Sequence, residues 1–139
     1  KELSELSSIQ DQIVRLKLGQ TQLTDNFMSQ ISDMPLLIQL DLDHTQVGDK
    51  GLTALENLKY LESVNLYATK VSDAGLMSLA KIKSLKRVYL WQSKVTEAGI
   101  ARLKKLRPTI EAAYCEKLDF EIVDNYYPFM TSYLFLNLP

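Results

Sequence analysis

The sequence of 139 residues is poor in the residues on which several classes of protein depend. A single cysteine, Cys115, excludes an internal disulfide bond and a metal site built from several cysteines. A single histidine, His44, leaves no second imidazole for a metal site or a relay. No stretch approaches the roughly 20 apolar residues of a membrane-spanning helix, and the polar opening of the chain lacks the apolar core of a signal peptide.

Charge of one sign is also missing, because 16 Lys and Arg residues face 17 Asp and Glu residues and leave a formal charge of −1. No global field therefore draws the protein to nucleic acid or to an anionic membrane, and any electrostatic effect must be local. The chain starts at Lys1 and not at Met, so we expect a piece of a longer or processed chain.

Motifs for catalysis are lacking as well. The chain contains no glycine-rich phosphate loop and no nucleophile elbow. His44 follows Asp43, but no nucleophile or held water is identified beside them, and a solvated polar strand surface is the simpler interpretation than a metal site formed with Asp41. Cys115 lies near an apolar strand pattern and is interpreted as a core residue. We expect no enzyme activity, no cofactor and no bound metal.

What the chain does have is an internal repeat. Four blocks of 24 residues follow one another without a gap over residues 13–108. The fourth and sixth positions of each block are apolar and predict a strand with one buried face, as in Leu40 and Leu42. The ninth position carries Thr21, Thr45, Thr69 or Ser93, which we expect to place a buried hydroxyl against the backbone of the neighbouring turn.

The second half of each block has a helical period. Leu76, Leu79 and Ile82 are spaced three apart and predict a buried helical stripe, and the second block repeats this spacing. A hydroxyl residue followed by an acid opens three of these helices, which predicts an N-cap and an acid favoured by the helix dipole. These pairs are Thr24 with Asp25, Ser72 with Asp73 and Thr96 with Glu97. Glycines 51, 75 and 99 recur near the helix starts, where a missing side chain brings the helix close to the adjacent coil.

One strand and one short helix per repeat predict an α/β fold in which residues 1–139 form a single domain. We expect a right-handed, curved solenoid with a parallel sheet on its concave face and short helices on its convex face. Residues 1–12 are predicted to form an N-terminal capping helix, with a partner-binding helix as the alternative. Residues 109–139 are predicted to hold a degenerate fifth strand, in register if one extra residue is allowed so that Ala113 and Cys115 continue the pattern. An aromatic segment follows it, interpreted as a C-terminal cap or an interaction surface.

The consensus L-x-x-L-x-L-x-x-T-x-V-[ST]-D-x-G-L-x-x-L-x-x-L resembles the bacterial leucine-rich-repeat family over residues 13–108. Segments such as LDHTQVGDKGL and NLYATKVSDAGL resemble repeats that some environmental bacteria append to membrane-anchored c-type cytochrome proteins. This resemblance implies an exported protein, periplasmic or at the cell surface. It implies no haem here, because the C-x-x-C-H attachment motif is absent.

The outward-facing strand residues should form columns across the concave face. One column contains Lys17, Asp41, Asn65 and Tyr89, and the next contains Gly19, Asp43, Tyr67 and Trp91. We therefore expect an acidic group of Asp41, Asp43 and His44 beside an aromatic group of Tyr67, Arg87, Tyr89 and Trp91. Exposed Trp, Tyr and Arg dominate the binding energy of many interfaces, although rings paired across strands also shield a sheet without any ligand.

These residues predict a protein–protein interaction module that binds a partner, or another domain of the parent chain, through its concave face. We expect no nucleic-acid partner and no membrane insertion by this segment. Two alternatives stay open. One is a carbohydrate or small-ligand module that uses the same rings with Asp41 and Asp43, and the other is a structural spacer in a larger exported protein.

Overall fold

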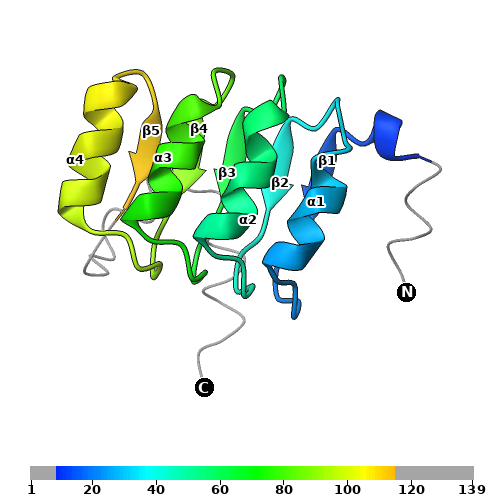
Figure 1. Ribbon diagram of the computed structural model, residues 1–139, viewed down its shortest axis with the longest axis horizontal. Coiled ribbons are helices and arrows are strands. Elements are labelled where there is room, and N and C mark those ends of the chain that lie inside the picture. The colour runs from blue at the N-terminus through cyan, green and yellow to red at the C-terminus, as the bar shows by residue number, and fades with distance from the viewer. Residues whose placement is uncertain (1–8, 115–139) are drawn as a thin grey trace, which may run out of the picture.

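The computed structural model describes residues 9–114 and shows an α/β fold built on a five-stranded parallel sheet. The strands follow one another in chain order across the sheet, and α1 to α4 lie side by side along one face (Figure 1). The strands are β1 (Arg15–Lys17), β2 (Gln39–Asp41), β3 (Ser63–Asn65), β4 (Arg87–Tyr89) and β5 (Glu111–Ala113). Each strand is thus followed by a connection that returns the chain to the start of the next strand.

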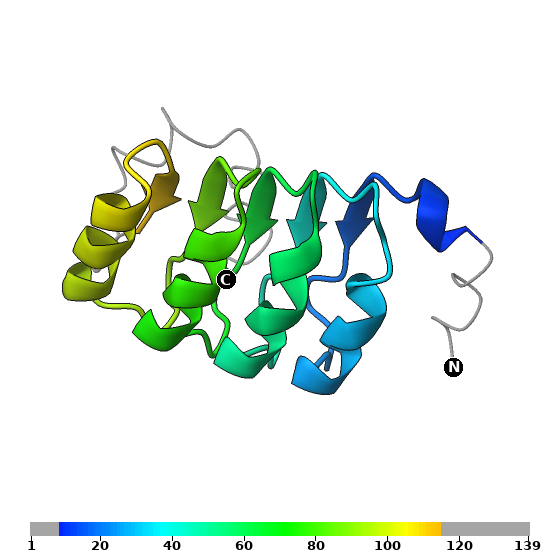
Figure 2. The ribbon, with the colours of Figure 1, turned by 45° about the horizontal axis from the view of Figure 1, so that its top comes forward.

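The helices lengthen along the chain. The first two repeats form α1 (Met28–Ile31) and α2 (Asp49–Thr53), each joined to a 3₁₀ turn, η3 (Asp25–Phe27) and η4 (Ala54–Asn57). The last two repeats form the longer α3 (Asp73–Lys81) and α4 (Glu97–Leu106), and a short 3₁₀ helix, η2 (Gln10–Gln12), precedes β1. The rotated view in Figure 2 shows the helices as one layer and the strands as a second layer behind it.

The strand register reproduces the sequence period. Leu16, Leu40, Val64, Val88 and Ala112 are successive partners across the sheet, each 24 residues after the last. These residues and the apolar residues two positions later point toward the helices and pack in the core. The predicted helical stripe of Leu76, Leu79 and Ile82 is fully buried as well. The alternation of the strands and the period of the helices are therefore confirmed.

A residue in the left-handed backbone conformation follows each of the first four strands, three positions after the last strand residue. Gln20, His44, Ala68 and Gln92 have φ values of 58°, 54°, 53° and 53°, and none of them is glycine. This conformation costs a residue with a side chain about 1 kcal/mol. It is held because the amides of Gln20, His44 and Ala68 donate to the carbonyl oxygens of Asp43, Tyr67 and Trp91 in the next repeat. The turn after each strand is thereby fixed to its neighbour.

Acidic residues at the helix starts connect consecutive repeats. The Asp49 carboxylate accepts hydrogen bonds from the amides of Ser72 and Gly75 and from the Ser72 hydroxyl, at 2.8, 3.0 and 2.6 Å. Asp25 accepts from the Gly48 amide, and Asp73 accepts from the amide and hydroxyl of Thr96. The sequence suggested only a helix-dipole role for these acids, whereas the structure shows that they bond across the repeat interface.

The recurring glycines leave room for these carboxylates. A Cβ atom at Gly75 would lie 2.5 Å from Oδ1 of Asp49 and 2.9 Å from Cδ1 of Leu52, and Gly51 and Gly99 meet the preceding acid in the same way. No described glycine has a positive φ angle, so space and not backbone conformation requires glycine at these positions. Close approach of the helix to the adjacent coil is confirmed.

The hydroxyl predictions are confirmed in part. Thr45 and Thr69 are buried, but their hydroxyls donate to Leu42 and Leu66 three residues earlier, within their own turn and not in the neighbouring one. Ser72 and Thr96 accept from amides of the helices they precede. Thr24 forms no such bond, because the chain enters a 3₁₀ turn at Asp25 in which the Phe27 amide donates to the Thr24 carbonyl.

The fifth strand is present, but its predicted register is wrong. Ala112, not Ala113, is the partner of Val88, and Ala112 and Tyr114 pack against the core. The turn before β5 closes one residue later than in the preceding repeats, at Ile110 instead of at residue 109, but Ala112 still follows Val88 by 24 residues, so the junction contains no extra residue. In this turn the Arg107 guanidinium donates to the carbonyl oxygens of Ala80, Ile82, Lys83 and Leu85 at 2.7–3.1 Å.

The predictions for the two ends fall mostly outside the described residues. Of the expected capping helix over residues 1–12, the structure describes only the last part, which contains η2. The aromatic segment and Cys115 lie beyond residue 114. Within residues 9–114, no helix is long and apolar enough to cross a membrane.

Candidate functional site

The candidate site lies on the face of the sheet opposite α1 to α4, which we call the sheet face. Strand alternation directs Leu16, Leu40, Val64 and Val88 into the core, so the residues on either side of them point to the sheet face. Three columns result from the register. They comprise Arg15, Gln39, Ser63, Arg87 and Glu111, then Lys17, Asp41, Asn65, Tyr89 and Ala113, then Gly19, Asp43, Tyr67 and Trp91.

A hydrogen-bonded chain joins the second and third repeats on this face. Oδ1 of Asp41 accepts from the Asn65 side-chain amide at 2.9 Å and from the Asp43 backbone amide at 3.2 Å. The side-chain oxygen of Asn65, Oδ1, in turn accepts from the Tyr67 backbone amide at 3.1 Å. Asp41 and Asn65 therefore each close the turn that follows their own strand, and the bond between them links the two turns.

Asp43 is the exception to the expected solvent-exposed acidic group, because it is only 3% exposed. Its carboxylate fills the space beside Gly19 on the neighbouring strand, where a Cβ atom would collide with Oδ1 of Asp43. Oδ2 of Asp43 contacts Nδ1 of His44 at 2.9 Å, while Oδ1 is buried without a hydrogen-bond partner among the described residues. The absence of a side chain at residue 19 thus allows an outward-pointing aspartate to become buried.

His44 connects this carboxylate to the aromatic part of the face. The His44 and Tyr67 rings meet edge to face, with centroids 4.7 Å apart and planes at 80°, a favourable geometry for aromatic rings. The left-handed backbone of His44, its contact with Asp43 and the Tyr67 ring restrict its orientation from three sides. The His44 side chain is nevertheless 46% exposed, so one part of the ring faces solvent.

Burial changes the acid–base properties of two of these groups. It raises the pKa of Asp41 to about 6, with further contributions from the side-chain hydrogen bond and the charge of Asp43. Burial, followed by the negative charge of Asp43, also raises the pKa of Tyr67 above its ordinary value. The Asp41 carboxyl therefore keeps its proton to a higher pH than an exposed aspartate does.

Across residues 9–114, no group of three His, Cys, Asp or Glu side chains is arranged to hold a metal ion, and this includes Asp41, Asp43 and His44. The hydrogen bonds of the cluster connect a carboxylate, an amide and an imidazole without a hydroxyl or thiol nucleophile.

The aromatic group extends over the fourth repeat. Tyr89 is the register partner of Asn65 and is partly buried, as is Trp91 two residues later. Arg87 at the start of β4 is exposed and is paired in register with Ser63 and Glu111. Tyr67 connects the aromatic group with His44 of the acidic group.

Two residues of the network were not selected from the sequence. Asn65 and Gly19 both stood in the predicted columns, yet only charged and aromatic residues were chosen as candidates. Asn65 completes the bond between the two repeats, and Gly19 makes room for Asp43. The signal available in the sequence was their position, 24 residues from Asp41 and Asp43 respectively.

Comparison with known proteins places the chain among structures of this α/β class. No family model matches the sequence, and a comparison with curated proteins finds no match. Among solved structures, the chain is similar to Leiomodin-1 Actin-Binding Site 2, with a TM-score of 0.64 and 14% sequence identity. The similarity covers 84% of this chain and 78% of the leiomodin chain. At this identity the likeness concerns the fold.

Proposed function

We propose that this chain is a right-handed, curved leucine-rich-repeat solenoid of the bacterial type and that it acts as a protein-interaction module. Its concave side would be the sheet face, which holds a protein partner or another domain of the parent chain. The resemblance of its repeats to those of exported bacterial proteins supports a periplasmic or cell-surface location. No catalytic step is part of this proposal.

The observation that carries the proposal is the fixed arrangement of polar and aromatic groups on the sheet face. Asp41, Asp43, His44 and Tyr67 are linked by hydrogen bonds and a ring contact and lie on neighbouring strands. Side chains that are already ordered lose little conformational entropy when a partner binds. Tyr67, Tyr89, Trp91 and Arg87 supply the residue types that contribute most to binding energy at protein interfaces.

The structural neighbour adds a general argument for a protein partner. It is an actin-binding site, so an architecture similar to this one binds a protein in another chain. The 14% identity supports no particular partner for the present chain.

The test is capture of a partner by the purified chain, followed by affinity measurement with Trp91→Ala and Tyr67→Ala. We expect each variant to lose roughly 30-fold or more in affinity, since truncation of a central aromatic residue costs about 2 kcal/mol or more. Arg102→Ala on α4 serves as the matched control and should leave affinity unchanged. Thermal melts of all variants check the fold. Unchanged affinity in both aromatic variants would show that the sheet face is not the binding surface.

A glycan array addresses the carbohydrate alternative with the same protein. Saturable binding to defined sugars that is lost in Trp91→Ala would replace the protein-partner proposal. Full activity of the parent protein after substitution of Tyr67, Tyr89 and Trp91 together, in a chain that still folds, would instead indicate a spacer.

A further inference from the structure

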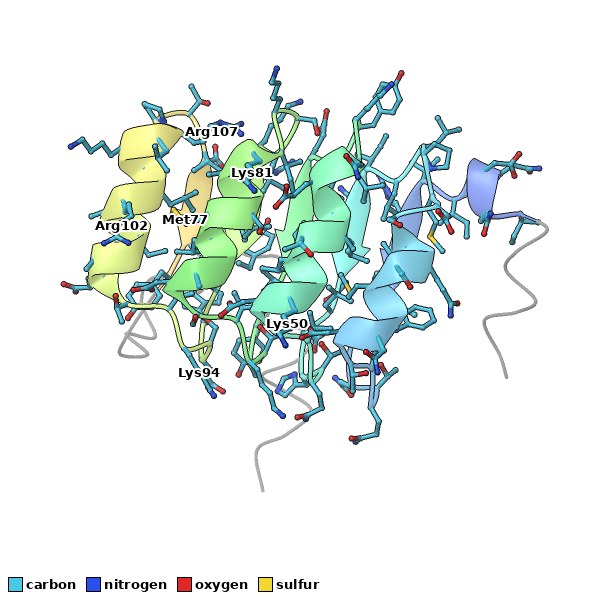
Figure 3. All side chains as sticks on the ribbon, viewed as in Figure 1. Lys50, Met77, Lys81, Lys94, Arg102 and Arg107 are labelled. Atoms are coloured by element: carbon cyan, nitrogen blue, oxygen red, sulfur yellow. The ribbon has the colours of Figure 1, made fainter. Side chains whose placement is uncertain are left out.

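A second surface lies along the edge of the molecule where the helices end and the strands begin, which we call the helix-end rim. It comprises the connections 32–38, 57–62, 82–86 and 107–110, together with the adjoining helix ends and residues 9–14 before β1. Lys81 at the end of α3 and Arg107 just after α4 are both labelled along it in Figure 3, whereas Lys50 and Lys94 lie at the opposite edge. The rim is separate from the sheet face.

Exposed apolar side chains are concentrated on this rim. The most exposed large hydrophobic residues of the described chain all belong to it, and their exposed fractions range from 40% to 57%. They are Ile9, Val14, Leu36, Tyr60 and Leu106. Leu36 and Tyr60 occupy the same position in consecutive repeats, 24 residues apart. Scattered single apolar residues are normal on a protein surface. Their restriction to the helix-end rim, in contrast, calls for an explanation.

The same rim is basic toward the end of the array. Between residues 81 and 107 the rim carries Lys81, Lys83, Lys86, Lys104, Lys105 and Arg107, and Glu97, the only acidic residue in this stretch of sequence, lies at the other end of α4. Lys59, Lys83, Lys104 and Lys105 on the rim are exposed and form no ion pair within residues 9–114. Lys81 and Lys86 pair with Glu56 and Glu62, yet their side chains are still 64% and 63% exposed.

A role for these lysines at the negative ends of the helix dipoles accounts for part of the pattern. It does not account for the apolar residues among them. Tyr60 follows Lys59 directly, and Leu106 follows Lys105. Apolar side chains that alternate with lysines suit the boundary between lipid head groups and acyl chains, where lysine stems and tyrosine rings are partly immersed and the charged ends reach anionic head groups.

We propose that the helix-end rim docks on an anionic membrane surface. Rim lysines would contact lipid phosphates, and Leu36, Tyr60 and Leu106 would enter the head-group layer without crossing it. A membrane fits better than a nucleic acid, because nucleic acid offers no environment for exposed leucines. It also fits better than an acidic protein, because the exposed apolar residues are spread along one edge, from Leu36 and Tyr60 in two connections to Leu106 at the end of α4, an extent that suits a broad surface.

The experiment measures partition of the full chain onto vesicles of phosphatidylcholine alone and of phosphatidylcholine mixed with phosphatidylglycerol. We expect binding to the anionic vesicles only, weakened by added salt. The variant Lys83→Gln/Lys104→Gln should reduce the partition coefficient about thirty-fold at low salt, because each lysine near an anionic surface contributes about 1 kcal/mol. Tyr60→Ser should weaken binding further.

The matched control is Lys50→Gln/Lys94→Gln, which removes the same charge from the opposite edge and should retain binding. An equal loss in both double variants would show that net charge, and not the rim, determines binding, and would overturn the proposal. So would the absence of binding to anionic vesicles, or binding to DNA or to polyglutamate in its place. Trp91→Ala should bind vesicles normally, which keeps this outcome independent of the proposed sheet-face function.

Discussion

Asp49 and Ser72, which are 23 residues apart, are joined by two hydrogen bonds across a repeat interface, from the Ser72 amide and hydroxyl to the two carboxylate oxygens of Asp49. The Gly75 amide donates to the same carboxylate. An acid at the start of one helix therefore accepts from backbone donors at the start of the next helix, of which the Gly75 amide also donates to the Ser72 carbonyl oxygen.

Asp49→Ala should lower the free energy of unfolding by roughly 2 kcal/mol, because the Ser72 amide and hydroxyl lose this acceptor and the Gly75 amide keeps only the Ser72 carbonyl oxygen. Urea denaturation followed by circular dichroism measures the change. Asp25→Ala should cost less, since Asp25 accepts a single bond from Gly48. Asp33→Ala, at an exposed position, is the control and should have little effect. Equal losses at all three positions would contradict the role assigned to Asp49.

Gly75→Ala should destabilise the protein although alanine favours helices. The added Cβ would lie 2.5 Å from Oδ1 of Asp49 and about 3 Å from Leu52 and Val71 side-chain atoms. We expect a loss of about 1–3 kcal/mol from this overpacking. Gly48→Ala is the matched control, because its nearest neighbour would lie 3.6 Å away. Denaturation of both variants under one condition decides the question, and a stabilised Gly75→Ala protein would show that the interface yields to the methyl group.

Arg107→Lys should destabilise the connection between α3 and β4. The planar guanidinium donates to four carbonyl oxygens, and a lysine ammonium cannot reproduce this fork. A loss of about 2 kcal/mol is expected, together with faster amide hydrogen exchange in the last turn of α3. Arg102→Lys, on the exposed side of α4, is the matched control because it makes the same substitution. It should change neither the stability nor the amide exchange rate in α3. A result in which both variants melt alike would remove the structural role of Arg107.

Asp41 should make stability depend on pH. The folded-state pKa of about 6 lies above the ordinary value of 3.8, so the folded protein binds this proton more tightly than the unfolded chain. The resulting stabilisation is complete below about pH 4 and is lost as the pH rises through about 6.

Asp41→Asn should therefore melt at a higher temperature than the parent protein at pH 7, by an amount equivalent to about 1 kcal/mol after allowance for the partly exposed carboxyl. The difference should shrink at pH 4. Asn keeps an oxygen that can accept from Asn65 and from the Asp43 amide, so these contacts are retained. A melting difference that does not change with pH would indicate that Asp41 does not carry the proton.

Much of the fold was predictable because the repeat itself fixes it. Leu40, Val64 and Val88 recur every 24 residues, and the sheet register has the same period. The periods of two and of three to four residues separate strand from helix in each block. The register of β5 was missed because the prediction allowed one extra residue at the junction, whereas Ala112 follows Val88 by the usual 24 residues and only the closure of the turn at Arg107 is shifted by one.

The site was predictable only to the level of columns. The alternation places Asp41, Tyr67 and Tyr89 on the sheet face, but it does not predict how far each side chain is buried. Asp43 is buried because residue 19, which lies beside it in the preceding repeat, is glycine. This relation between two repeats becomes visible only once the strand register is known. The His44 orientation depends on a left-handed backbone at a residue that is not glycine, for which the local sequence carries no clear signal.

The uniform 24-residue register between β1 and β5 has a consequence for how such a chain can change over time. Suppose that residues 61–84 were duplicated. Asp73 of the first copy would then face the second copy's equivalent of Gly75, and the second copy's equivalent of Asp73 would face Gly99. Both junctions would therefore already be complementary. Gene duplication can therefore lengthen the array in whole units, whereas an insertion of any other length would have to be absorbed in a connecting turn for the sheet register to be kept.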